Sequence, residues 1–444
     1  MSASVVQDLS TSKSAYLALS VLLAALFPRI LMALGGPGII KFFHFALAIL
    51  FCIFTLPYIS RSSTKYLLFG LIVLLWTIAV SALVNRAGLV NVVLDFVLLA
   101  EPFLLLIFII DQPMSQHDTH RFHIVVALAV FAHTVLGYYQ YFTLGVTNPD
   151  DVKGLFVGQG AGHHVAGAVA LTAAVYFFTV TKGSSSLVLR VFLAASVASI
   201  AILSDSKQVI LVFLAALSLL LLLKINRLKR FLQYVALISI SIGGAIVIAY
   251  TVLPGLAFWA DIALIRKGIE AKLVIVSIVL SHYDSILNWL FGLGPGHTVG
   301  RLASLLPDYL DQLRPLGATI SVVTDLTEQE RISNFVSNEK TGSSMWSPFF
   351  FWAGLWGDLG LVGCGAYLFL WYIVFREVCS SELSHYFVFT ILIFGLVFSW
   401  LEEPGYMLFV TALIGLVWQQ RQHDAEDARL QPSTLKLSAF EQHA

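Results

Sequence analysis

The amino-acid sequence predicts an all-α, polytopic helical membrane protein. Three observations lead to this prediction: 58% of the 444 residues are hydrophobic, only 12% are charged, and the mean hydropathy is +0.86. Soluble domains carry about 25% charged residues. Apolar runs of ~20 residues, the length that crosses a bilayer as a helix, recur along nearly the whole chain. These features exclude an ordinary soluble enzyme, a disordered chain and a coiled coil.

Charge and cysteine usage narrow the classes further. The formal net charge is +0 and the pI is near 7.2, which argues against a nucleic-acid partner. The three cysteines, Cys52, Cys364 and Cys379, are far apart and form neither a disulfide framework nor a metal-binding pattern. No convincing acidic cluster for Mg²⁺ appears, and no cofactor is expected. The first apolar run is predicted to be an uncleaved signal anchor.

About twelve spanning helices are expected. The apolar runs lie at 14–35, 39–60, 66–85, 88–110, 122–144, 163–181, 187–203, 208–223, 231–253, 347–375, 384–401 and 405–420. Basic residues gather in alternate connections, and this asymmetry sets the orientation of the chain. The densest cluster lies between the eighth and ninth runs, at Lys224, Arg227, Lys229 and Arg230. Because the number of spans is even, both termini are predicted to be cytoplasmic.

One long outer loop, residues 254–346, separates the N-terminal helices (1–253) from the C-terminal helices (347–420). Long translocated segments escape the positive-inside rule, so its basic residues do not count against this topology. Within it, residues 262–291 have a helical and quite apolar pattern, which predicts a helix in the membrane interface. Residues 297–346 are more polar and show no clear period. The tail, residues 421–444, is polar and is predicted to be disordered and cytoplasmic.

Ionisable residues at membrane depth are costly and therefore suggest function. They are Arg29, Asp95, Glu101, His133, His163, His164, Asp205, Lys207, Asp358, Glu402 and Glu403. Arg29 is interpreted as a side chain that snorkels to the outer surface. His133 is interpreted as a packed, hydrogen-bonded histidine. Glu402 and Glu403 are interpreted as a structural pair, with Arg331 of the loop as a possible partner.

A glycine-rich segment, Phe291-Gly292-Leu293-Gly294-Pro295-Gly296-His297, is the most distinctive part of the loop. Gly292, Gly294 and Gly296 allow backbone N–H groups to converge on an anion, although such turns also simply end helices. The segment is not a P-loop, because no Gly-Lys-Ser/Thr follows it and no strand precedes it. His297 could be a base, a phosphate donor or an exposed loop histidine.

Basic residues around this segment could bind a diphosphate. The candidates that the topology puts at the outer surface are Lys207, Arg266, Lys272 and Arg301. Lys207 belongs to Ser204-Asp205-Ser206-Lys207, a predicted tight turn between the seventh and eighth runs. A solvated turn lysine explains Lys207 equally well.

Asp358 lies within Asp358-Leu359-Gly360-Leu361-Val362-Gly363. The predicted helix puts it two to three turns inside the tenth run. It could act in acid–base chemistry. Alternatively, Gly354, Gly357 and Gly360 form a small-residue helix interface, and Asp358 is a polar contact within it.

Three of these segments together resemble the O-antigen polymerase and ligase superfamily, the Wzy/WaaL type of membrane glycosyltransferase. Ser204-Asp205-Ser206-Lys207 resembles its Ser-Arg-type turn. Phe291-Gly292-Leu293-Gly294-Pro295-Gly296 resembles its "fGlGpG" segment early in a large periplasmic loop. Asp358-Leu359-Gly360-Leu361-Val362-Gly363 resembles its "ElGliG" segment after that loop. The resemblance runs from about residue 150 to 400.

Two departures from the family pattern affect what is expected. Lys207 stands where arginine is common, which keeps the charge but loses the bidentate fork. Ligases typically carry a histidine about nine residues before the acidic position of the last segment, and Phe349 stands there in this chain. The second departure favours an exopolysaccharide or capsule polymerase over a ligase.

The resemblance implies a metal-independent glycosyltransferase of the bacterial inner membrane. The donor would be a glycan on undecaprenyl diphosphate, and the acceptor a sugar hydroxyl on another lipid-linked repeat. A single, inverting displacement at the anomeric carbon would expel the diphosphate. Lys207, Arg266, Lys272 and Arg301 would then bind the diphosphate, and His297 or Asp358 would be the base. Membrane lipid, a chain-length regulator and a flippase would be partners by analogy.

Three other functions are compatible with the sequence. An O-antigen ligase would transfer the same glycan to the lipid A core. A lipid-glycan flippase or transporter would also suit about twelve spans, although transporters tend to show repeated halves with broken helices at the membrane midplane, and none is visible. A non-catalytic membrane scaffold would tolerate replacement of Lys207, Lys272 and Arg301.

Overall fold

The protein is described by a computed structural model, which covers residues 3–55, 59, 61–111, 114–145, 149–158, 161–181, 186–223, 232–233, 236, 262–337 and 350–441. Across these ranges the secondary structure is entirely helical, without a strand, so the predicted all-α class is confirmed there. Most of the predicted run 231–253 lies outside the described residues, as does Phe349.

The N-terminal half forms ten helices in the described ranges. They are α1 (Ala3–Leu26), α2 (Pro28–Ala33), η1 (Gly38–Phe42), α3 (Phe43–Thr55), α4 (Ser62–Asn85), α5 (Leu89–Asp111), α6 (Gln116–Gln140), α7 (Gly162–Val180), α8 (Leu187–Leu203) and α9 (Lys207–Leu223). A π-helical turn, Tyr141–Gly145, extends α6, and a short 3₁₀ turn, Pro149–Asp151, precedes α7. The predicted tight turn at Ser204–Lys207 is confirmed, because α8 ends at Leu203 and α9 begins at Lys207.

The C-terminal half begins with four shorter helices and ends with a long one. Its elements are α12 (Ile262–Leu280), α13 (Ile286–Phe291), α14 (Arg301–Leu313), a 3₁₀ turn at Arg314–Leu316, α15 (Val322–Ser337), α16 (Phe351–Ile373), a π-helical turn at Val374–Val378, α17 (Glu382–Val397), η8 (Trp400–Glu402) and α18 (Pro404–Glu441). Local sequence explains several starts. Ser285 and Asn288 form a capping box at α13, Ser381 and Ser384 form one at α17, and proline occupies the first position of α18.

Five helical stretches are long and apolar enough to cross a membrane: Ser62–Asn85, Leu89–Asp111, Gln116–Thr143, Gly162–Val180 and Phe351–Val378. Other apolar stretches are shorter, among them Leu187–Leu203, Lys207–Leu223 and Glu382–Val397. A helix of 17 residues spans less than the ~30 Å of a bilayer core. The predicted total of about twelve spans therefore stays a prediction.

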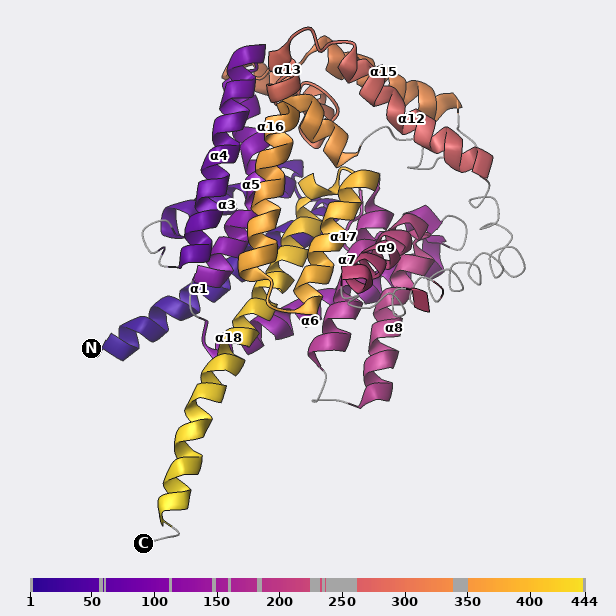
Figure 1. Cartoon of the computed structure of the whole chain (residues 1–444). Helices are drawn as coiled ribbons and strands as arrows, with labels where there is room; N and C mark the ends of the chain where they lie inside the picture. The colour runs from indigo at the N-terminus through magenta and orange to yellow at the C-terminus, as the bar shows by residue number, and fades with distance from the viewer. Residues whose placement is uncertain are drawn as a thin grey trace.

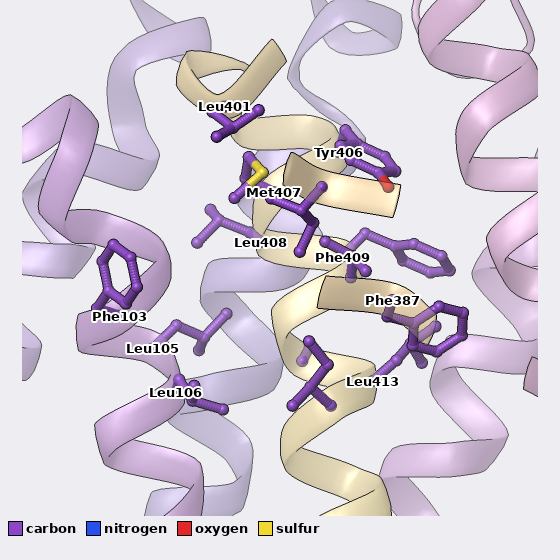
Figure 2. Packing of buried hydrophobic residues seen from close by; sticks show 14 of the residues in the cluster. Phe103, Leu105, Leu106, Phe387, Leu401, Tyr406, Met407, Leu408, Phe409 and Leu413 are labelled. Carbon is purple, nitrogen blue, oxygen red and sulfur yellow. The ribbon is translucent and has the colours of Figure 1, made fainter. Parts of the chain in front are cut away.

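The core is built around the first half of α18. Figure 2 shows Leu408 of α18 pointing toward Leu105 and Leu106 of α5, and Leu413 on the opposite side of α18, beside Phe387 of α17; each of these side chains is at most 1% exposed. Burial of whole apolar side chains on this scale stabilises a fold by about 1.5–3 kcal/mol per residue in water, and in a membrane close packing supplies the corresponding attraction. Consequently α18 positions the short η8 connection that precedes it.

The prediction of a disordered tail is wrong, because α18 continues to Glu441. Polar composition predicts exposure to solvent, but glutamine, arginine, alanine and glutamate are also strong helix formers. A helix already ordered by the buried stretch from Tyr406 to Trp418 extends through such residues without a new nucleation step.

The helices of the long loop, residues 262–337, lie at one end of the bundle. Figure 1 shows α12 and α15 beside the upper ends of α4 and α16, whereas α1 begins and α18 ends toward the opposite side. Residues 297–346 showed no readable helical period, yet both α14 and α15 form there. Pro307 lies inside α14, and a proline there normally argues against a helix, so the sequence did not predict this one. The apolar face of α14, made by Leu302 and Leu306, packs near Leu98 of α5.

Candidate functional site

The two glycine-rich segments identified in the sequence contact each other directly. The backbone N–H of Leu293 donates to the Gly357 carbonyl over 2.8 Å, and that of Gly294 donates to the Asp358 carbonyl over 3.0 Å. A Cβ at Gly292 would lie 2.4 Å from the Asp358 carbonyl carbon, and one at Gly360 would lie 2.5 Å from that of Leu290. We call this contact, between residues 290–298 and 357–360, the glycine junction. It interrupts α16, because Gly360 has a φ of 66°.

Asp358 anchors the loop at the glycine junction. Its Oδ1 accepts from the Thr298 hydroxyl over 2.5 Å and from the Thr298 N–H over 2.8 Å, and its Oδ2 accepts from the Gly296 N–H over 3.0 Å. The side chain is buried. Three donors thus converge on a carboxylate that water does not reach. This geometry favours the polar-contact interpretation of Asp358, and its role as a base stays a prediction.

His297 is buried rather than exposed, since only 5% of it is accessible. Its Nδ1 lies 3.1 Å from the Leu293 carbonyl, and its Nε2 lies 2.9 Å from the Thr319 hydroxyl. A carbonyl can only accept, so Nδ1 carries the proton and Nε2 accepts from Thr319. Burial lowers the pKa of His297, which keeps the ring neutral near pH 7. Both nitrogens are occupied by the loop, and its proposed role as a base stays untested.

Replacing Gly360 by alanine is expected to destabilise the protein by about 2–5 kcal/mol, because a side chain there has a strained φ and overlaps the Leu290 carbonyl. Gly365 is the matched control in the same helix, since a Cβ there meets no atom within 4 Å. Alanine at Gly365 is expected to be neutral or mildly stabilising. Thermal unfolding in detergent, followed by tryptophan fluorescence, measures both; equal midpoints for the two variants would contradict the glycine junction.

The four predicted diphosphate-binding cations lie in different surroundings. Arg266 has an 80% exposed side chain and pairs with Glu270 over 2.8 Å. Lys207 pairs with Asp205 over 2.7 Å, within electrostatic reach of His164. The Nζ of Lys272 donates to a backbone carbonyl at the end of α17, over 3.1 Å. Of these four residues, only Arg301 lines the cavity described below.

Lys272 has a titration that can be measured. Burial lowers its pKa from 10.5 to about 8. Between these pH values the unfolded chain binds a proton that the folded chain does not, so stability rises with pH across that window. The Lys272→Met variant lacks the titrating group. Relative to it, the free energy of unfolding of the wild-type protein is expected to rise by up to about 3 kcal/mol as the pH rises through this window. Unfolding midpoints of both proteins across the window test this, and a constant difference would refute it.

A polar cavity of about 390 Å³ lies beside the start of α14. Its ionisable lining residues come from five segments of the chain and are Arg29, Lys41, His44, Arg301, Asp308 and Glu403. Positively chargeable side chains therefore outnumber carboxylates. Arg29, expected to snorkel to the outer surface, lines this cavity, and its side chain is 17% exposed.

Glu402 and Glu403 hold Arg301 in place. The Arg301 side chain donates to Glu403 Oε2, and its backbone N–H donates to Glu402 Oε2 over 2.8 Å. The other Glu403 oxygen lies 3.8 Å from Arg29. Burial raises the pKa of Glu402 to about 7. The acidic pair is thus structural, as the sequence suggested, and its partner in the loop is Arg301, the first residue of α14.

His44 reaches the cavity from the first turn of α3. Its Nδ1 lies 2.7 Å and 2.9 Å from the two carboxylate oxygens of Glu101, in the middle of α5. Each residue is only 2% exposed. Glu101 thus has a partner 57 residues away, and Pro102 follows it directly inside the helix.

An apolar cavity of about 460 Å³ adjoins the polar one. The two share Phe42, Phe45, Leu98 and Leu305 as lining residues. At their boundary the Lys41 ammonium lies 5.0 Å from the centre of the Tyr309 ring, a cation–π distance. An amphiphile with an anionic head and an apolar chain fits such a pair of adjoining cavities.

A scan against protein-family models and a search of curated proteins both found no match for this chain. Function therefore has to be inferred from the geometry and chemistry of the site.

Sequence reasoning missed Lys41 and His44. Both fall at the start of the apolar run 39–60, where Lys41 counts only as a basic residue of an outer short loop and nothing local marks His44. Their neighbour in space, Arg301, is more than 250 residues away in the chain, so no local pattern joins them. The available signal was that Lys41 and His44, two basic side chains, lie three residues apart at the start of an apolar run. The interpretation of His133 is confirmed: its Nε2 lies 3.1 Å from the Ala166 carbonyl, and its Nδ1 accepts from the Leu155 N–H.

Proposed function

We propose that this protein is a polysaccharide polymerase that joins oligosaccharide repeats carried on undecaprenyl diphosphate. It would act on the periplasmic side of the bacterial inner membrane, with both termini in the cytoplasm. The ends of α1 and α18 on the side opposite α12 and α15 agree with this orientation (Figure 1). The products would serve exopolysaccharide, capsule or O-antigen synthesis.

The observation that carries the proposal is the pair of adjoining cavities. Arg29, Lys41 and Arg301 line the polar cavity and can donate to phosphate oxygens, and arginine does so with a planar fork. The apolar cavity beside it, lined by Leu94, Leu302 and other apolar residues, suits the first isoprene units of the carrier. A cavity with only one of these two characters would suit a simple anion or a simple lipid equally well.

The chemistry follows from where the charge develops. The acceptor hydroxyl oxygen forms a bond to the anomeric carbon of the donor glycan. The bond from that carbon to the diphosphate oxygen breaks, and its electron pair leaves with the diphosphate. Cations already oriented around that oxygen stabilise the leaving group without reorganisation at the moment of reaction. Glu403 orients Arg301 and Arg29 while leaving other N–H groups of each guanidinium for the phosphates.

Purified protein in detergent, supplied with undecaprenyl-diphosphate repeat units of its own host, tests the proposal. A ladder of products that differ by one repeat each is the expected result, read by gel or mass spectrometry. Transfer to lipid A core instead, when that acceptor is supplied, would make the protein a ligase. Binding of the lipid with neither product would contradict an enzyme and favour a flippase.

A further inference from the structure

The buried pair of His44 and Glu101 borders the polar cavity through His44, which lines it. Neither residue is among the cations proposed to hold the diphosphate. Both Glu101 oxygens lie within 2.9 Å of His44 Nδ1. A carboxylate only accepts hydrogen bonds, so Nδ1 is the protonated nitrogen of the neutral ring. The lone pair is then on Nε2. In the part of the chain that the structure describes, Nε2 has no hydrogen-bond partner, although His44 lines the cavity.

This arrangement is that of an oriented general base. A carboxylate that binds one ring nitrogen fixes the tautomer, directs the other nitrogen, and stabilises the imidazolium that forms when a proton is taken up. His297 offers no such lone pair, because the loop already occupies both of its ring nitrogens. Asp358 is buried, and both of its oxygens already accept from N–H or hydroxyl groups of the loop.

We propose that His44 is the catalytic base that deprotonates the acceptor hydroxyl, and that Glu101 is the residue that positions it. The inference rests on the proposed polymerase function. The hydroxyl proton passes to His44 Nε2 as its oxygen bonds to the anomeric carbon, and the diphosphate departs with the electron pair of the broken bond. His44 is then a cation held beside Glu101, and it returns the proton to solvent or to the departing diphosphate.

A purely structural role for the pair is the competing explanation, because the contact also ties α3 to α5. The two roles differ in what a conservative change affects. His44→Gln keeps a hydrogen-bonding side chain of similar length beside Glu101 but cannot take up a proton. Glu101→Gln keeps an acceptor oxygen for Nδ1–H but removes the charge that stabilises the imidazolium.

The test compares kcat, the donor Kd and two acceptors in the wild type, His44→Gln and Glu101→Gln. We expect kcat to fall by about 10²–10⁴-fold in His44→Gln and by a smaller factor in Glu101→Gln, while the Kd for undecaprenyl diphosphate stays unchanged. A second acceptor, fluorinated next to the attacking hydroxyl, has a more acidic hydroxyl and needs less help from a base. The deficit of His44→Gln is therefore expected to shrink with it.

Several results would overturn the inference. A kcat within about threefold of the wild type in His44→Gln would do so, since general-base catalysis is worth far more. A rise in Kd that matches the loss of activity would assign the pair to binding or folding, and an equal deficit with both acceptors would exclude a base. A wild-type protein that makes no transfer at all overturns the polymerase proposal and the base with it, whereas active wild type with unimpaired His44→Gln overturns the base alone.

Discussion

Replacing Arg301 by alanine is expected to reduce polymer formation by about 10²–10³-fold, the usual loss when one donor to a developing negative charge is removed. Arg301 lines the polar cavity, and two buried carboxylates fix it there. Arg301→Lys keeps the charge without the planar fork, and its polymer formation is expected to fall by an intermediate factor, about tenfold. The yield of the product ladder measures both.

Two controls separate catalysis from folding in the Arg301 experiment. Arg266→Ala removes an arginine from the same loop whose side chain is 80% exposed, so its ladder is expected to match the wild type. Arg301→Ala also strips a partner from Glu403, which is 2% exposed. Combining it with Glu403→Gln removes the negative charge that has lost Arg301, and is expected to restore thermal stability without restoring the ladder. A double variant that regains polymer would show that Arg301 serves folding alone.

Asp358→Ala is expected to destabilise the protein by about 3–6 kcal/mol, because it leaves three buried donors at the glycine junction without an acceptor. The loop that carries His297 would lose its side-chain attachment to α16 and keep only the backbone hydrogen bonds of Leu293 and Gly294, so activity is expected to fall as well. Chemical unfolding and limited proteolysis between α13 and α14 measure the two effects. Thr298→Val removes only the hydroxyl and is expected to cost about 1–3 kcal/mol.

Asp358→Asn distinguishes an anchor from a base. The amide retains one acceptor oxygen for Thr298 but offers an NH₂ group where the Gly296 N–H donates. We therefore expect partial loss of stability and a matching partial loss of activity. A variant with wild-type stability and no activity would instead make Asp358 the base and contradict its assignment as an anchor.

The helical class and the two glycine segments could be predicted from the sequence because each is encoded locally. A low charge content and apolar runs predict helices in a membrane, and Gly292 and Gly360 mark backbone positions that a side chain would block. That these two segments contact each other follows from tertiary packing. Asp358 was singled out correctly as an unusual residue, but its partners, Gly296 and Thr298, are about 60 residues away.

The residues that line the polar cavity could not be predicted either, because they lie far apart in the sequence. The sequence grouped Arg266, Lys272 and Arg301 because they flank one glycine segment, yet nearness along a chain of helices does not bring side chains together. Arg266 instead pairs with Glu270, one turn along α12. The residues that join Arg301 come from α2, η1 and α3, and only folding places them at one site.

The central claim is that the polar cavity binds the diphosphate of a polyprenyl carrier whose chain enters the apolar cavity. Photo-crosslinking tests it most directly, with a polyprenyl diphosphate that carries a diazirine on its first isoprene unit and mass spectrometry of the labelled peptides. We predict labelling of η1, α3 and α14, at residues such as Phe42, Leu305 and Tyr309, that unlabelled undecaprenyl diphosphate and Arg301→Ala both suppress. Labelling confined to α9 or α12, beside Lys207 and Lys272, or labelling that the competitor does not reduce, would contradict the claim.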